Sequence, residues 1–384
     1  MKHTRLLSFL LALLLLSSSL FGCGTNGPEP APAPDQTPDK TEEPAITVSY
    51  ELLVPSNTLH STMQDEYLNS KNYNSLTDFM NGSGENSRPQ LLLKWEHTVT
   101  GAKASALKEC VVISKDDAFS DPVRMEASGG RLDIGSLNLE LGETLYWYVE
   151  GTIGKEVFKS QVETLKISEN APRNLYVDGV TNCRDLGGWE TKSGGTTKQG
   201  QLFRTGRFSK VTSSGKEVLL NQLGVKTEID LRTKKQVQDH GDSTEESALG
   251  SSVNYYFLPM EYENISNILT ASVNKDSLLK VFEVLGDEAN YPIAFHCSIG
   301  TDRTGMIAFL VLGLCGVSKK DLYRDYLFSG FGKIDKKPSI GAMDRYLETV
   351  GAAEGSTLAE KVENYLLSIG VKAEQIATVQ KMMK

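Results

Sequence analysis

The chain has 384 residues, which is enough for two or three domains with substantial cores. It carries 40 lysines and arginines against 49 aspartates and glutamates, a formal net charge of -9 at pH 7. This acidic balance argues against nucleic acid as a partner. The five cysteines show no CxxC or other metal-ligand spacing, so we predict neither a zinc site nor any other metal or cofactor.

The first residues have the pattern of an export signal. A basic start precedes an apolar run at residues 6–16, which is too short to span a membrane as a helix. The segment that ends at Cys23 resembles a bacterial lipoprotein signal, which implies that residues 1–22 are removed and Cys23 is lipidated; a plain secretory signal is the alternative. Residues 23–45 are rich in Pro, Thr, Asp and Glu and predict a disordered tether. We therefore expect an exported bacterial protein, anchored through Cys23 to the extracytoplasmic side of the cell membrane.

Residues 46–168 predict an all-β module. Short β-branched and aromatic runs, separated by turn residues, occur at 91–95, 109–114, 144–149 and 156–158. Such spacing is typical of a β-sandwich, with Trp95 and Trp147 between the sheets, and the runs around them resemble fibronectin type III and immunoglobulin-like modules. Residues 56–88 are polar and predict an inserted loop or a poorly ordered segment. The module is expected to be a spacer, or to bind a protein or glycan partner.

Residues 169–384 have a different pattern, which begins near Pro172. Strand-like and helical runs alternate, which is typical of an α/β domain with a mainly parallel sheet. The predicted strands are 226–231, 253–258 and 291–295. The predicted helices are 277–285 (with Ser277 as its cap), 303–315, 319–328, 340–350, 358–369 and 373–383.

One loop of this domain carries clear chemistry. Cys297 is followed by five residues and then by Arg303-Thr304-Gly305, between a predicted strand and a predicted helix. Five intervening residues let the backbone curl so that its N–H groups surround an anion, and the helix dipole favours phosphate at the same point. The helix dipole and the arginine also favour the thiolate of Cys297, which makes it a nucleophile near neutral pH.

Four further segments accompany the loop in a fixed order: 182–188, 202–206, 229–233 and 325–329. With the loop, they resemble the bacterial tyrosine/lipid (dual-specificity) phosphatase family over about residues 171–384. The resemblance implies a protein-tyrosine-phosphatase-like fold. It also implies hydrolysis of phosphomonoesters on tyrosine, on serine or threonine, or on phosphoinositides, without a metal.

Roles within the loop follow from this chemistry. Cys297 attacks phosphorus and forms a phosphocysteine, while Arg303 holds the phosphoryl oxygens and Thr304 donates a hydrogen bond to the departing thiolate. His296 is expected to shape the loop. The phosphate-binding backbone is predicted to comprise Ser298, Ile299, Gly300, Thr301, Asp302 and Arg303.

The general acid is open between two places in the chain. The resemblance points to Asp302, inside the loop, and the alternative is Glu261 or Glu263 from a separate segment. Many relatives in the resembled family carry lysine at the position of Thr301, where we expect the pocket rim, so a strong phosphoinositide preference is not predicted.

Ion pairs are expected to support the loop from outside. The residues predicted to form them are Arg184, Asp185, Asp230 and Arg232. Cys183 either packs in the core or forms a protective disulfide with Cys297.

Three functions are consistent with these motifs. The first is a phosphatase that acts on phosphotyrosine or a similar phosphomonoester of a protein or small molecule. The second is a phosphatase for phosphoinositides or inositol phosphates, and the third is a surface lipoprotein that binds anions with little catalysis.

Overall fold

The computed structural model describes residues 45–72, 91–262, 269–332 and 338–384. Cys23, the predicted signal and nearly all of the predicted tether lie outside these ranges. Among the helices of the described ranges, none has the length and apolar character needed to cross a membrane.

Two antiparallel sheets form the N-terminal part of the described chain. The first has the order β1-β2-β5, and the second has the order β4-β3-β6-β7 with β8 also paired to β6. The strands are β1 (Thr47–Leu53), β2 (Leu92–Thr100), β3 (Lys108–Ser114), β4 (Val123–Ala127), β5 (Arg131–Asp133), β6 (Thr144–Ile153), β7 (Glu156–Lys159) and β8 (Glu163–Lys166). Two 3₁₀ turns, η1 (Ala104–Ala106) and η2 (Gly135–Leu137), lie between strands.

Strand β6 shows how side chains from these sheets reach the core. Buried and half-buried residues alternate along the whole of β6, so one face of this strand points to the core. Trp95 of β2 and Trp147 of β6 lie in the same hydrophobic cluster, at 3% and 1% exposure. The prediction that these two tryptophans lie in the core between two sheets is confirmed.

A short helix, α1 (Thr62–Asn69), lies within the segment that the sequence predicted to be irregular. Ser61 caps it, because its hydroxyl accepts from the N–H of Gln64 while the Gln64 side chain accepts from the N–H of Ser61. Tyr67 and Leu68 are buried and belong to the hydrophobic core of the C-terminal domain. The expectation of an irregular segment is therefore wrong for α1.

The C-terminal domain is built on a five-stranded sheet with the order β12-β11-β13-β10-β9. The strands are β9 (Arg184–Asp185), β10 (Leu202–Thr205), β11 (Thr227–Asp230), β12 (Asn254–Phe257) and β13 (Ile293–His296). All neighbours are parallel except β9, which pairs antiparallel with β10. The predicted mainly parallel sheet is confirmed, and β13 lies at its centre, which places the end of β13 deep in the domain.

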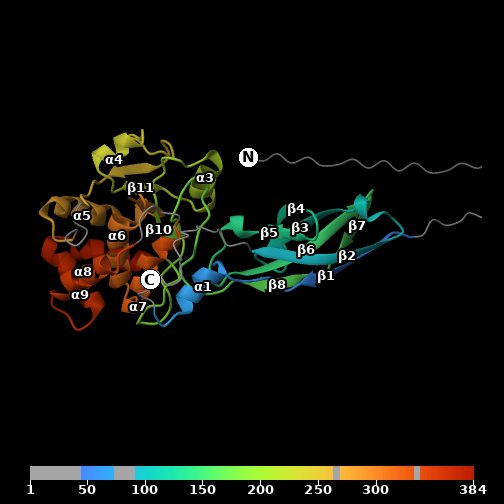
Figure 1. Ribbon diagram of the computed structural model, residues 1–384, viewed down its shortest axis with the longest axis horizontal. Helices are drawn as coiled ribbons and strands as arrows, with labels where there is room; N and C mark the ends of the chain where they lie inside the picture. Colours follow the sequence, from blue (N-terminus) through green and yellow to red (C-terminus); the bar gives the residue numbers. More distant parts are fainter. Residues whose placement is uncertain (1–44, 73–90, 263–268, 333–337) are drawn as a thin grey trace, which may run out of the picture. The chain divides into compact units, whose positions relative to one another are not determined.

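Helices cover both faces of this sheet. On one face lie α3 (Ser213–Glu217) and the π-helical turn η3 (Val218–Gln222), whose Leu219 packs on Phe203 and Ala294. The other face carries α5 (Ser272–Leu285), α6 (Asp302–Leu314), α7 (Lys319–Phe328), α8 (Ile340–Gly351), α9 (Leu358–Ile369) and α10 (Ala373–Met383), several of which are seen together in Figure 1. The short elements α4 (Lys234–Asp239), η5 (Glu288–Asn290) and η6 (Ser329–Phe331) complete the domain.

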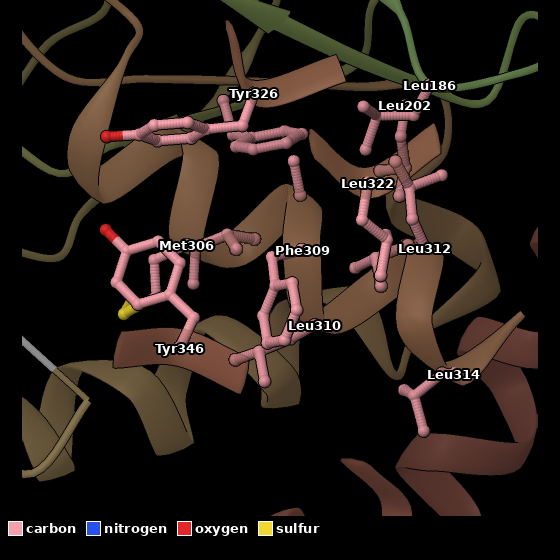
Figure 2. Close-up of a cluster of buried hydrophobic side chains, with 14 of the residues drawn as sticks. Leu186, Leu202, Met306, Phe309, Leu310, Leu312, Leu314, Leu322, Tyr326 and Tyr346 are labelled. Carbon is pink, nitrogen blue, oxygen red and sulfur yellow. The ribbon is translucent and has the colours of Figure 1, made fainter. Parts of the chain in front are cut away.

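Helix α6 is buried along its whole length. Figure 2 shows its side chains Met306, Phe309, Leu310, Leu312 and Leu314 among residues from neighbouring elements, including Leu322, Tyr326 and Tyr346. A helix buried on all sides can hold the residues at its first turn rigidly, because packing fixes its position in every direction.

One predicted helix start is wrong. The helix expected over 277–285 begins at Ser272, and Ser277 lies inside it, where its hydroxyl donates to the carbonyl of Pro259 at 2.6 Å. Its observed N-cap, Ala271, makes no side-chain capping bond, so the sequence carries no signal for that start.

Candidate active site

The loop from Cys297 to Thr301 joins the central strand β13 to the buried helix α6. It lies at the carboxyl ends of the parallel strands of the sheet, where such folds place their ligands. Cys297 is 2% exposed and Thr304 is fully buried. Gly300 has a φ of +72°, and a Cβ atom there would lie 2.4 Å from the carbonyl oxygen of Thr205. The turn therefore requires glycine at this position.

The carbonyl groups of the loop accept hydrogen bonds from side chains of neighbouring segments. Those of Ser298, Ile299 and Gly300 accept from Arg207 (3.1 Å), Asn182 (2.9 Å) and Arg204 (2.8 Å), respectively. Within the described residues, the backbone N–H groups from Ser298 to Thr301 make no hydrogen bond. Because the carbonyls are held on the outside, the N–H groups remain for an anion on the inside.

Cys297 sits at the base of this loop with an acidified thiol. Burial raises its pKa, but the charge of Arg303 and hydrogen bonding from Thr304 outweigh burial, and the net effect is a pKa below the usual range. The nearby carboxylate of Asp302 opposes this shift. A thiolate at this position is the nucleophile that phosphoryl transfer to sulfur needs.

Arg303 is held by neutral groups. Its Nη1 donates to the carbonyls of Leu231 (3.0 Å) and Met260 (3.2 Å) and to Oε1 of Gln236 (2.8 Å). Its guanidinium carbon lies 4.5 Å from the ring centroid of Tyr262, and its buried Nε has no partner among the described residues. No carboxylate among the described residues pairs with Arg303, so its charge remains available for phosphate and for the thiolate.

Other buried arginines of the domain are neutralised. Arg184 and Arg204 both pair with Asp325, Arg184 at 3.0 Å, and Arg204 also holds the loop carbonyl of Gly300. The charges of these two arginines outweigh the burial of Asp325 and lower its pKa. Arg184 therefore supports the loop through Asp325 and Arg204, as an ion-pair network.

The remaining supporting residues lie on both sides of the sheet's centre. Arg232 donates to both carboxylate oxygens of Asp230, at 2.7 to 3.0 Å. These bonds fix the last residue of β11, the strand that pairs with β13. Asp185 does not meet the loop: it pairs with Arg173 at 3.0 Å and accepts from the N–H of Gly200. The expectation that an ion pair of Asp185 supports the loop is wrong, because successive side chains of a strand point to opposite faces of the sheet: Asp185 meets Arg173, whereas Arg184 meets Asp325.

Asp302 is the first residue of α6 and is 9% exposed. The hydroxyl of Tyr326 donates to its Oδ1 at 2.9 Å, and the hydroxyl of Tyr346 lies 3.4 Å from its backbone carbonyl. Glu261 is exposed, and Asn274 holds its backbone. Glu263 lies outside the described residues.

One expectation about a neighbour of the loop is corrected, and of the two alternatives for Cys183 the structure supports packing in the core. Thr301 is only 1% exposed, so its side chain is buried and does not form an exposed pocket rim. Cys183 packs with Phe203 and Ala294 on one face of the sheet, whereas Cys297 belongs to the cluster on the other face. Both cysteines are free thiols, and their places on opposite faces exclude a disulfide between them in this structure.

Several residues at the site were not predicted as such from the sequence. These are Gln236, Tyr262, Arg204, Arg207, Asp325, Tyr326 and Glu228. Gln236 had a signal, because Thr233 and Gln236 form a capping box at α4. Arg204 and Asp325 lie in the segments 202–206 and 325–329, which accompany the loop in the sequence, but a segment match does not say which side chain points to the loop.

The strand, the loop of five residues and the buried helix define a phosphatase domain of the cysteine-dependent class. Residues 175–383 match the family described as the tyrosine phosphatase family. The chain belongs to this family, because the match covers more than half of its length.

Named relatives agree with the family. A candidate tyrosine-protein phosphatase of Cupriavidus necator is 29% identical over 177 residues, which are 41% of this chain and 63% of that protein. The tyrosine-protein phosphatase of Nostoc commune is 25% identical over 46% of this chain and 71% of its own length. The triple specificity protein phosphatase PtpB of Mycobacterium tuberculosis is 24% identical over 53% of this chain and 86% of its own. The chain thus spans less than two thirds of the first of these relatives.

Among solved structures, TpbA of P. aeruginosa is 20% identical and is aligned over 44% of this chain and 87% of its own, with a TM-score of 0.29. The catalytic core of the PP-IP phosphatase SIW14 of S. cerevisiae is 16% identical over 44% of this chain and 84% of its own, with a TM-score of 0.26.

Proposed function

We propose that this protein hydrolyses phosphomonoesters, with phosphotyrosine as the leading substrate class, through a phosphocysteine intermediate. One observation carries the proposal: a thiol of lowered pKa, a guanidinium with neutral partners and several backbone N–H groups without a bond among the described residues meet where the loop enters α6. These three features favour a phosphoryl group carrying negative charge.

The residues act in two steps. In the first, the thiolate of Cys297 attacks phosphorus in line with the leaving oxygen, the S–P bond forms as the P–O bond breaks, and Asp302 gives its proton to that oxygen. In the second, Asp302 takes a proton from water, the water oxygen attacks phosphorus, and the thiolate leaves with a hydrogen bond from Thr304. Arg303 and the loop N–H groups bind the phosphoryl oxygens throughout.

The acid is tested by leaving-group dependence. Asp302→Asn is expected to lower kcat by about 10²–10⁴-fold on phosphotyrosine peptide. The loss should be much smaller on an activated aryl phosphate, whose leaving group needs no proton. Glu261→Gln is the matched control and should change little. Equal rates for Asp302→Asn and the unchanged protein on phosphotyrosine would exclude Asp302, and a loss in Glu261→Gln would move the role there.

A second substrate class is favoured by Arg207. Its N–H and Nη1 hold the carbonyl of Ser298, which places a second guanidinium beside the phosphate loop. A phosphoinositide or inositol phosphate has a second anionic group that such a cation would bind. A panel of phosphotyrosine peptide, phosphoinositides and inositol hexakisphosphate, run against Cys297→Ser, separates the classes. Binding without turnover on every substrate would instead favour an anion-binding lipoprotein.

The rest of the chain is proposed to place this domain outside the cytoplasm. The support is the signal-like start, with lipid attached at Cys23 and a membrane as the partner of the acyl chains. The two sheets that share Trp95 and Trp147 support a fibronectin type III-like or immunoglobulin-like identity for residues 46–168, as a spacer or as a site for a protein or glycan. Cys23→Ala, followed by fractionation of membranes, tests the anchor: a variant that stays membrane-bound would contradict it.

A further inference from the structure

His296, the last residue of β13, is completely buried and has an acceptor at each ring nitrogen. Its Nε2 lies 2.9 Å from Oε1 of Glu228, and its Nδ1 lies 3.2 Å from the carbonyl oxygen of Cys297. A carboxylate and a carbonyl can only accept, so both ring nitrogens have to donate. The geometry therefore fits an imidazolium, which carries a proton on each nitrogen.

The charges around the ring favour the same form. Oδ1 of Asp230, opposite His296 in the strand register, lies 3.7 Å from Nδ1. Asp230 also accepts from Arg232 and from the hydroxyl of Tyr255, and Arg232 reaches Asp242 at 2.6 Å. The cluster thus holds three carboxylates, those of Glu228, Asp230 and Asp242, and one guanidinium, that of Arg232, so a proton on His296 offsets part of the excess negative charge.

The pKa of His296 is raised for these reasons. Burial works to lower it, as does the charge of Arg232, but Asp230 and the hydrogen-bonded Glu228 outweigh both. The ring of Phe208, 4.8 Å away, is the aromatic neighbour on this side and carries no charge. Glu228, Asp230 and His296 are close enough to hold a metal ion, but Arg232 and the hydroxyl of Ser247 already occupy oxygens of both carboxylates.

We propose that Glu228 is a positioning residue for the nucleophile: it keeps His296 doubly protonated, so that Nδ1 holds the carbonyl of Cys297 and a positive charge lies one residue from the thiolate. Glu228 is 2% exposed and lies in the middle of a strand, where a carboxylate is costly to bury unless it has such partners. This inference rests on the proposed role of Cys297 as the nucleophile. It adds a residue from a different strand that sets how readily that nucleophile ionises.

The test is Glu228→Gln in the full chain, which removes the charge and preserves the shape. We would measure alkylation of Cys297 by iodoacetamide against pH, with mass spectrometry to separate it from the other cysteines, and kcat/KM on p-nitrophenyl phosphate. We expect about tenfold slower alkylation and about tenfold lower kcat/KM on the acid side of the profile, as for a thiol pKa raised by about one unit. The two proteins should converge at alkaline pH. Glu246→Gln, the same change at an exposed position, should match the unchanged protein.

A double-mutant cycle shows whether Glu228 acts through the imidazole. In a His296→Gln background, Glu228→Gln should add no further shift; an equal shift in both backgrounds would overturn the proposal. An unchanged alkylation profile in a folded Glu228→Gln protein would overturn it as well. If Glu228→Gln does not fold, Ser247→Ala replaces it in the test, because Ser247 is the other hydrogen-bond partner of Glu228. This variant is expected to shift the alkylation profile in the same direction by a smaller amount. The absence of a shift would count against the proposal. Alkylation of Cys297 does not depend on turnover. A protein without phosphatase activity would therefore contradict the proposed function, while the role of Glu228 would still be tested by the alkylation profile.

Discussion

At the scale of single residues, the site is organised by which charges are compensated. Arg184, Arg204 and Arg232 each have a carboxylate within hydrogen-bond distance, and their role is to fix backbone and strands. Arg303 has the carbonyl oxygens of Leu231 and Met260 and the amide of Gln236 instead. Neutral acceptors orient a guanidinium without cancelling its charge, so phosphate meets nearly the full charge of Arg303.

Gln236 should therefore matter for activity through its hydrogen bond to Arg303. Replacing it with alanine removes one of three acceptors on Nη1 of Arg303. A hydrogen bond to a charged group contributes about 1.5–3 kcal/mol, so we expect kcat/KM to fall by about tenfold, the lower end, because two carbonyls remain. Steady-state kinetics and the inhibition constant of inorganic phosphate measure the change.

Gln238→Ala is the control for this prediction, since Gln238 is exposed on the same helix. This variant removes the same kind of side chain from α4, and we expect no change in kcat/KM or in the inhibition constant of phosphate. Equal phosphate inhibition of Gln236→Ala and the unchanged protein would mean that the backbone carbonyls hold Arg303 by themselves.

At the scale of elements, long and strongly patterned segments were predictable and short ones were not. Helices α7, α9 and α10 have the predicted bounds, because Ser318 and Thr357 are capping residues and Gly370 ends α9 in a left-handed conformation. By contrast, β9 has two residues, too few for a period to appear, and α4 has six. Similarly, the loop chemistry of Cys297 and Arg303 could be predicted from their spacing, whereas Tyr326 and Glu228 could not, because they reach the loop only through the tertiary fold.

The loop between β13 and α6 gives an element-scale prediction at Gly300. Alanine there would combine a left-handed backbone with a Cβ atom 2.4 Å from the carbonyl oxygen of Thr205, so the loop has to move. We expect near-complete loss of phosphatase activity and destabilisation by more than the about 1–2 kcal/mol that left-handed backbone costs by itself. Thermal unfolding and turnover of p-nitrophenyl phosphate test both parts.

The chain offers a matched control in Gly224, which has a φ of +65° but open space within 4 Å of the position that a Cβ atom would take. Gly224→Ala should cost about 1–2 kcal/mol from backbone strain and retain activity. If Gly300→Ala retained activity to the same degree, close packing of the loop against β10 would not be a requirement for function.

At the scale of the whole molecule, the described residues form one compact unit, and the N-terminal sheets do not end at a simple linker. Arg173 is 4% exposed and donates to the carbonyls of Asn138 (2.6 Å) and Leu139 (3.0 Å) as well as to Asp185 of β9. Helix α1, which lies between β1 and β2 in the chain, contributes Tyr67 and Leu68 to the core of the catalytic domain. The N-terminal part thus supplies structure to the catalytic domain in addition to any spacing role.

This coupling predicts that a substitution in α1 weakens the phosphatase domain. Tyr67 is fully buried, 5.8 Å from the ring of Phe331, and Arg324 of α7 donates to the carbonyl of Ser70 at the end of α1. Removal of a large buried aromatic side chain typically costs about 3–5 kcal/mol, so Tyr67→Ala should lower both the unfolding temperature and the temperature at which phosphatase activity is lost. Met63→Ala, on the exposed side of α1, should change neither by more than a small amount. If Tyr67→Ala unfolded at lower temperature while activity survived to the original temperature, α1 would belong to a separate folding unit, and the N-terminal part would be a spacer only.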